Sequence, residues 1–140
     1  MSGPILALRA AILAHLRGDG ELGALMGGQL RLHDEPPRAA EPVYGVFGDV
    51  RAEDWSTDLD RGHRQEATIR VWAREGSARS GLLAAERMSL LLHDAALALN
   101  GHRLVSLRVS AIAAAKDERS NLTRATLTLV AVTEVLPVAP

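Results

Sequence analysis

The chain has 140 residues, of which 47% are apolar and 24% charged, and its formal net charge is −1. This composition is typical of a folded globular protein and excludes a disordered chain. The near-neutral charge and the four aromatic residues, Tyr44, Phe47, Trp55 and Trp72, argue against sequence-specific contact with nucleic acid, which uses basic grooves and stacking platforms.

Other classes are excluded by what the sequence lacks. Without cysteine, disulfides and thiolate zinc sites are impossible. No window approaches the ~20 apolar residues of a membrane span, and the N-terminus lacks a signal-peptide pattern, so we expect no membrane partner and a cytoplasmic protein. The length suits one domain over residues 1–140, in which the proline-containing segment 136–140 is expected to be flexible.

The first predicted element is an amphipathic helix. Its apolar residues recur on one face: Ile5, Leu8, Ile12 and Leu16. Ser2 can cap this helix, Pro4 is tolerated in its first turn, and Gly18-Asp19-Gly20 ends it. A short helical turn over 21–26 and a short strand over 30–33 follow, and Pro36-Pro37 ends that strand.

The segment 42–74 predicts two strands joined by a long polar loop. Residues 43–47 alternate, and one face of the second strand carries Ala67, Ile69, Val71 and Ala73. The loop between them, 49–64, is rich in aspartate and is expected to be an interaction surface. Trp55 in this loop is either folded back as a local plug or presented to a partner. Trp72 is expected to pack in the core.

A second helix and two long strands are predicted next. Ser77 stands at the N-cap, the apolar residues recur as far as Leu99, and Asn100-Gly101 is expected to end the helix. The strands cover 102–113 and 121–135, and each buries one side: Val105, Leu107, Val109 and Ala111 in the first, and Ala125, Leu127, Leu129 and Ala131 in the second.

The other face of the last strand carries Val130 and Val132, which indicates that a helix or, preferably, a neighbouring subunit covers it. The order of the elements predicts an α+β fold. It consists of a mostly antiparallel sheet of about four to five strands with two main helices packed on one face.

No motif for catalysis or metal binding is present. The five histidines lack HxxxH or HExxH spacing, and no apolar surroundings raise the pKa of an acid in Glu53-Asp54 or Asp58-Asp60. A Gly-x-Ser-x-Gly elbow is absent, and Gly27-Gly28 lacks the remainder of a phosphate loop. We therefore expect no catalytic residue, no metal and no cofactor.

Several segments together resemble one protein family. They are the Asp54-Trp55-Ser56-Thr57 core and the strand ending in Val71-Trp72, preceded by ALMGGQLRLHDEPP and followed by LHDAALALNGHRLVSLRV and KDERSNLTRATLTLVAV. In order and composition these segments are similar to the small tail terminator (tail completion) proteins of long-tailed phages, prophages and gene transfer agents. The resemblance covers about residues 5–132.

This resemblance implies a structural virion protein and no enzyme. Such proteins form rings, expected to be hexamers, that cap the head-proximal end of the tail tube, stop its polymerisation and join the tail to the head. The implied partners are further copies of the chain, the tail tube protein and the head-tail connector or stopper protein. The implied location is the cytoplasm during assembly, then the tail neck of the virion or gene-transfer-agent particle.

The residues expected at ring or tube contacts lie in two polar segments, because mixed-sign loops can form the heterologous contacts of a ring. They are Asp49, Arg51, Asp54, Trp55, Asp58, Arg61, Arg64, Lys116, Asp117 and Arg119. One other class stays open: a stand-alone small α+β ligand-binding or metabolic domain. A concave apolar cavity with converging polar groups would favour that class.

Overall fold

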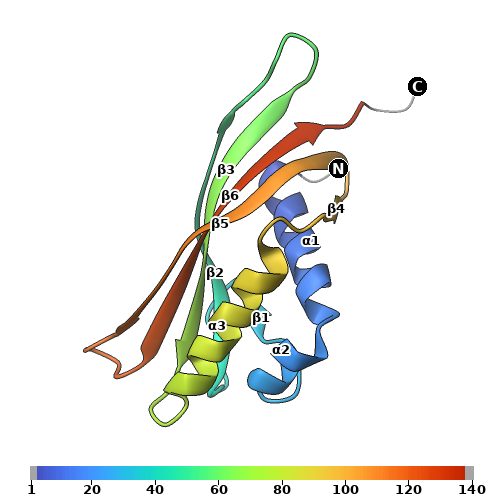
Figure 1. Ribbon diagram of the computed structural model, residues 1–140. Helices are drawn as coiled ribbons and strands as arrows, with labels where there is room; N and C mark the ends of the chain where they lie inside the picture. The colour runs from blue at the N-terminus through green and yellow to red at the C-terminus, as the bar shows by residue number, and fades with distance from the viewer. Residues whose placement is uncertain (1–2, 138–140) are drawn as a thin grey trace.

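A curved β-sheet with helices on one face forms the protein (Figure 1). The computed structural model describes residues 3–137, within which three helices and six strands occur. In chain order they are α1 (Pro4–Arg17), α2 (Gly20–Leu25), β1 (Leu32–His33), β2 (Val43–Asp54), β3 (Gly62–Ala73), α3 (Ala78–Leu92), β4 (Ala98–Leu99), β5 (His102–Lys116) and β6 (Thr123–Val135). The predicted α+β class is confirmed.

The strands lie in the order β1-β2-β3-β6-β5-β4. β1 pairs in parallel with β2, and all other neighbours are antiparallel. The mostly antiparallel sheet therefore has one strand more than the expected four to five, because the two-residue strand β4 was not predicted. β1 lies inside the predicted strand 30–33, whereas β4 lies inside the predicted second helix.

The core lies between the sheet and the helices α1 and α3. Leu8, Ile12 and Leu16 of α1, which recur at helical spacing, are buried. Alternate residues of the two central strands face the helices and are buried too: Ile69, Val71, Ala73, Ala125, Leu127, Leu129 and Ala131. Burial of a large apolar side chain contributes about 1.5–3 kcal/mol. The apolar period of each element therefore decides which face packs inward.

Helix α3 lies very close to the sheet at Gly81. A Cβ atom at Gly81 would lie 2.5 Å from the Cβ of Ala73 on β3. Ala84 and Ala85, one turn further along, are fully buried. These small residues allow the helix to lie directly against the strands.

Helix α3 ends earlier than predicted. It ends at Leu92 and not at Asn100-Gly101, and Asp94 takes a left-handed conformation with a φ of 59°. Residues Ala98–Leu99 instead form β4, and Asn100-Gly101 is the two-residue turn to β5. An Asn-Gly pair suits a tight hairpin as well as a helix end, so the local sequence does not distinguish the two.

The helix caps and the C-terminal segment differ in detail from the prediction. Gly3 is the N-cap of α1 without a side-chain hydrogen bond, and Ser2 lies outside the described residues. Ser77 is the N-cap of α3, but its side chain makes no capping hydrogen bond. The Leu136 N–H donates to the carbonyl of Gly101 at 3.0 Å, and the part of the predicted flexible tail from residue 138 onward lies outside the described residues.

Strand β5 departs most from the predicted alternation. Its register against β6 shifts between Leu104 and Ser106 and again between Val109 and Ala111. An extra residue in one strand moves the following side chains to the other face. Of the four predicted core residues in β5, only Leu107 is buried, whereas Val105 is 47% exposed. The prediction that β5 buries one whole side is therefore wrong.

Helix α2 is joined to α3 by an ion pair. The carboxylate of Asp19, the N-cap of α2, accepts a hydrogen bond from the Leu22 N–H at 2.9 Å and two from the Arg87 guanidinium at 2.8 and 3.0 Å. The bond from Arg87 is the main reason that the pKa of Asp19 is lowered from 3.8 to about 2, against the opposing effect of burial. This pair therefore stabilises the fold when Asp19 is ionised.

Asp19→Asn is expected to lower the free energy of unfolding near neutral pH by about 1–2 kcal/mol, because the charged pair is lost while an oxygen remains to cap α2. In the native chain this contribution is fully present above the unfolded pKa near 4 and is lost as the pH falls towards 2. Urea unfolding of both proteins at several pH values measures the effect. A difference between them that does not shrink below pH ~4 would contradict the role of this charge.

Candidate interaction surfaces

Strands β2 and β3 form a long hairpin that projects beyond the helices at one end of the sheet (Figure 1). β2 continues to Asp54 and β3 begins at Gly62, so the turn contains only residues 55–61. The predicted long loop over 49–64 is therefore wrong.

Charged side chains hold the polar part of this hairpin in strand conformation. Arg64 lies 3.4 Å from Glu53 across the strands and 2.9 Å from Glu66 along its own strand. The hydrogen bond with Glu66 raises the pKa of Arg64. Such cross-strand pairs stabilise antiparallel neighbours even where no apolar side chain is available. Three of the predicted contact residues, Asp49, Arg51 and Arg64, thus belong to strands.

The tip of the hairpin, residues 55–61, is closed by its own backbone. The Trp55 N–H donates to the carbonyl of Gly62 at 2.9 Å, and the Thr57 N–H donates to the carbonyl of Asp60 at 2.8 Å. The Thr57 hydroxyl in turn accepts from the Asp60 N–H at 3.1 Å. Polar contacts therefore order the tip without help from its apolar side chains.

Two apolar side chains remain exposed on this tip. Trp55 is 55% exposed and Leu59 is 93% exposed. Trp55 is thus not a buried plug. Its neighbour Asp54 accepts a hydrogen bond from the Ser56 hydroxyl, which lowers the pKa of Asp54. Leu59 is missing from the predicted contact set, although a leucine between two aspartates in a polar turn is a signal that could have identified it.

A second charged turn, residues 117–122, joins β5 and β6. The Asp117 N–H donates to the carbonyl of Leu122 at 2.8 Å. The Asp117 carboxylate accepts from the Ser120 hydroxyl, which lowers the pKa of Asp117. Lys116 and Arg119 are exposed beside this turn.

The two turns lie at opposite ends of the sheet (Figure 1). In the pairing of β3 with β6, Gly62 is level with Glu134, whereas Ala73 is level with Thr123. The predicted contact residues therefore form two separate groups. One group is on the β2–β3 hairpin: Asp49, Arg51, Asp54, Trp55, Asp58, Arg61 and Arg64. The other group lies beside the β5–β6 turn: Lys116, Asp117 and Arg119.

The sheet face opposite the helices, called here the open face, carries no helix within residues 3–137 (Figure 1). Val130 and Val132 lie on this face between Thr128 and Glu134 and are partly exposed. Trp72 is on the open face as well, 5.7 Å from the guanidinium carbon of Arg124. The prediction that Trp72 packs in the core is wrong, because it alternates with two buried residues of β3.

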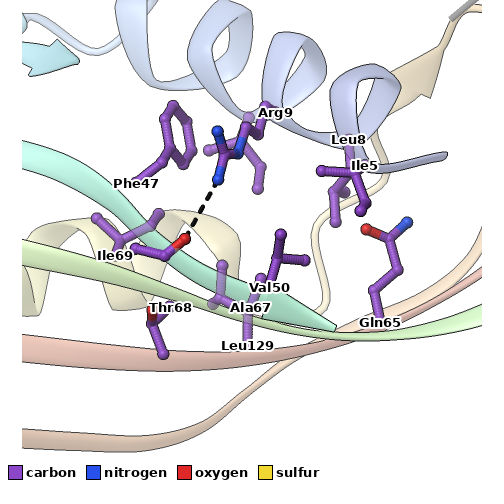
Figure 2. Close-up of a pocket in the computed structure, with 12 residues that line it drawn as sticks. Ile5, Leu8, Arg9, Phe47, Val50, Gln65, Ala67, Thr68, Ile69 and Leu129 are labelled. Atoms are coloured by element: carbon purple, nitrogen blue, oxygen red, sulfur yellow. Dashed lines mark hydrogen bonds between the residues drawn. The ribbon is translucent and has the colours of Figure 1, made fainter. Parts of the chain in front are cut away.

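A small cavity lies between α1 and the sheet (Figure 2). Arg9 spans it and donates to the carbonyl of Gly48 at 3.2 Å, with its guanidinium carbon 5.1 Å from the Phe47 ring centroid. The cavity volume is about 10 Å³, room for about one water molecule. Sites for small molecules are about 300–1,000 Å³ in volume. This cavity is therefore too small to be a ligand site.

Within residues 3–137, no cluster of three or more His, Asp or Glu side chains has the arrangement of a metal site. In the same part of the chain, no helix has the length and apolar character needed to cross a membrane.

A comparison with protein families gives a match over most of the chain. The model of the family "tail completion protein gp17" matches residues 10–134. The chain belongs to this family. The resemblance identified from the sequence is thereby confirmed.

Solved structures show the same fold as this tail completion protein. A chain from a structure described as the virion of a native gene transfer agent (GTA) particle is 28% identical, with a TM-score of 0.84. The match covers 96% of this chain and 99% of that chain. A second solved chain is 14% identical with a TM-score of 0.56, covers 99% and 100% of the two chains, and shows a shared fold alone. A comparison with curated proteins finds no match.

Three exposed features of this tail completion protein protrude from the surface or are flat. They are the hairpin tip, the β5–β6 turn and the open face of the sheet. Concave pockets suit small molecules, whereas protruding and flat surfaces suit contacts with other macromolecules. The geometry therefore favours assembly over ligand binding.

Proposed function

We propose that this protein is a tail terminator. In this proposal, identical copies form a ring, a hexamer, that caps the head-proximal end of the tail tube, stops its polymerisation and joins the tail to the head connector. The observation that carries the proposal is membership of the tail completion family over residues 10–134. The 28% identical chain from a gene transfer agent virion supports a place in an assembled particle.

The two ends of the sheet suit a protein that joins two partners. The hairpin tip presents Trp55 and Leu59, and aromatic side chains are enriched among residues that dominate binding energy. The β5–β6 turn at the other end presents charged residues, among them Lys116 and Arg119. In the proposed role, one end contacts the tail tube protein and the other contacts the connector or stopper protein.

The same proposal covers the location and the remaining interfaces. The whole chain, residues 1–140, acts as one unit, assembles in the cytoplasm and is then part of the tail neck of the particle. The contact residues predicted from the sequence belong to it, with Leu59 added. The role is structural and uses no cofactor. The alternative, a stand-alone ligand-binding domain, gains no support from the cavity of about 10 Å³ beneath α1, and the larger hollows of about 210–450 Å³ are open to solvent.

Cryo-electron microscopy of intact particles tests this function. We expect a six-fold ring of this chain in the neck, between the last ring of tube protein and the connector. Mass determination of the isolated neck should give six copies. A neck that lacks the chain, or a chain that is monomeric in the assembled particle, would overturn the proposal.

A further inference from the structure

Strand β5 has a free outer edge over its second half. The short strand β4 pairs only with His102–Arg103. The next part of the edge is covered by a loop, in which His93 Nδ1 accepts a hydrogen bond from the Val109 N–H at 3.1 Å. In the described chain, residues 111–116 pair with β6 alone. Half of the backbone groups of these residues therefore lack a strand partner.

Strand β2 has a free outer edge on the opposite side of the sheet. The two residues of β1 pair only with Gly45 and Val46. Beyond the register shift after Phe47, residues 50–54 pair with β3 alone. The sheet thus ends in one free stretch of strand at each edge, called here the β5 edge (residues 111–116) and the β2 edge (residues 50–54).

Residues 111–115 of the β5 edge lack the charged residues and prolines by which edge strands usually avoid pairing. Residues 111–116 are all exposed, and the first five are Ala-Ile-Ala-Ala-Ala. Neither proline nor an acidic residue interrupts this stretch, and Ile112 is 44% exposed. An exposed apolar edge without such protection is a template for pairing with another strand.

The two edges carry opposite charge. The β5 edge has one basic residue, Lys116, and no acidic residue, which gives a net charge of +1. The β2 edge has two acidic residues, Glu53 and Asp54, and one basic residue, Arg51, which gives a net charge of −1. We propose that the β5 edge of one copy pairs with the β2 edge of the next copy, which makes the sheet continuous between neighbours.

Charge also favours this pairing over the symmetric one. Two β5 edges that met about a two-fold axis would both be positively charged, whereas a β5 edge and a β2 edge have opposite charges. Juxtaposed like charges disfavour association, and complementary charges favour it. Pairing of different edges is heterologous, and heterologous contacts generate a ring where the rotation from copy to copy closes. The inference rests on the proposed function and specifies the contact that would build its ring.

Strand direction and position agree with this arrangement. β2 and β5 run in opposite directions in one copy, because three antiparallel steps separate them. Copies related by rotation about an axis along the strands would therefore pair these edges antiparallel. The free part of β5 is level with the start of β2, whereas the free part of β2 is its end. For the two free parts to meet, the neighbouring copy must be shifted along the strand direction. Closed sheets require such a stagger because their strands are tilted.

The alternation of side chains limits the register. Arg51 lies on the open face, since it pairs with Glu66, whose neighbour Gln65 is buried on the helix side. Residues directly opposite in an antiparallel pair share a face. On β5 the open-face positions are those that pair with Thr128, Thr126 and Arg124: Ala111, Ala113 and Ala115. One of these three should lie opposite Arg51 of the next copy.

Disulfide cross-linking tests the contact, because the native chain has no cysteine. Arg51→Cys is combined in turn with Ala111→Cys, Ala113→Cys and Ala115→Cys. Within one copy two strands lie between these positions, a separation of about 14 Å, and disulfides need Cα atoms within about 7 Å. Any disulfide must therefore join two copies. The matched control pairs Arg51→Cys with Leu90→Cys on exposed helix α3.

We expect one of the three pairs, under mild oxidation, to give a ladder of linked species up to the full ring. The purified protein and intact particles are both used. The control pair should give at least about tenfold less product. Charge reversal by Lys116→Glu should lower the yield of the productive pair by at least about threefold.

Two outcomes would overturn the edge pairing: particles that contain the chain as a ring but give no ladder with any pair, or a linked dimer from the single Ala113→Cys variant in place of the ladder. Particles without the chain in the neck would instead overturn the proposed function. The two failures are therefore distinguishable.

Discussion

Replacing both Trp55 and Leu59 with alanine is expected to yield a folded protein that no longer completes tails. The two side chains are 55% and 93% exposed, so their removal should change the free energy of unfolding by less than about 0.5 kcal/mol each. If they anchor a partner, truncation of a central aromatic residue alone costs about 2–4 kcal/mol of binding. For the pair we expect at least a 100-fold loss of infectious or transducing particles.

Three measurements are needed: the titre of infectious or transducing particles, electron microscopy of the tails, and thermal unfolding of the purified variant. The matched control is Leu90→Ala, because Leu90 is 70% exposed on α3 and lies on neither turn. The control should keep both the titre and the unfolding temperature. A normal titre from the double variant would remove the hairpin tip from the proposed interface.

The largest loss of stability is expected for Leu127→Ala. Leu127 is fully buried on the helix side of β6, and truncation of a buried leucine costs about 2.5–5 kcal/mol through lost burial and the cavity left behind. The neighbouring Thr128 points to the open face and is only partly buried. Thr128→Ala should therefore cost about 0.5 kcal/mol or less.

Urea unfolding of both variants measures the difference, with the native chain as reference. The two substitutions are adjacent in one strand, so they differ mainly in the face from which the side chain is removed. Equal losses from both would mean that the open face is packed as tightly as the helix side. That result would contradict a hydrophobic core on the helix side of the sheet alone.

Periodicity alone identifies most of the elements that build the core. Most of the predicted inward residues of α1, β3 and β6 are buried as the sequence predicts, whereas Ile5 and Ala67 are only partly buried. Each pattern repeats many times within one element, so a single element carries enough information to define its buried face. The family resemblance likewise depends on the order of several such segments.

Three predictions are wrong for a common reason. Each depends on pairing between segments that are far apart in the chain. They concern the extent of the β2–β3 hairpin, the end of α3 at Leu92 and the two register shifts of β5. Cross-strand contacts such as Arg64 with Glu53 extend the hairpin into a polar segment that has no apolar alternation of its own. A shift of one residue in β5 moves its side chains to the other face without any change in composition.

The candidate interaction surfaces were likewise predictable from the sequence only in part. The sequence by itself determined the α+β class, the inward faces of the regular elements and the polar character of the two turns, because these depend on residues close together in the chain. Only the tertiary structure decided that the turns lie at opposite ends of the sheet and that part of each sheet edge is left free. Those properties depend on strand order and register, which arise from contacts between distant segments.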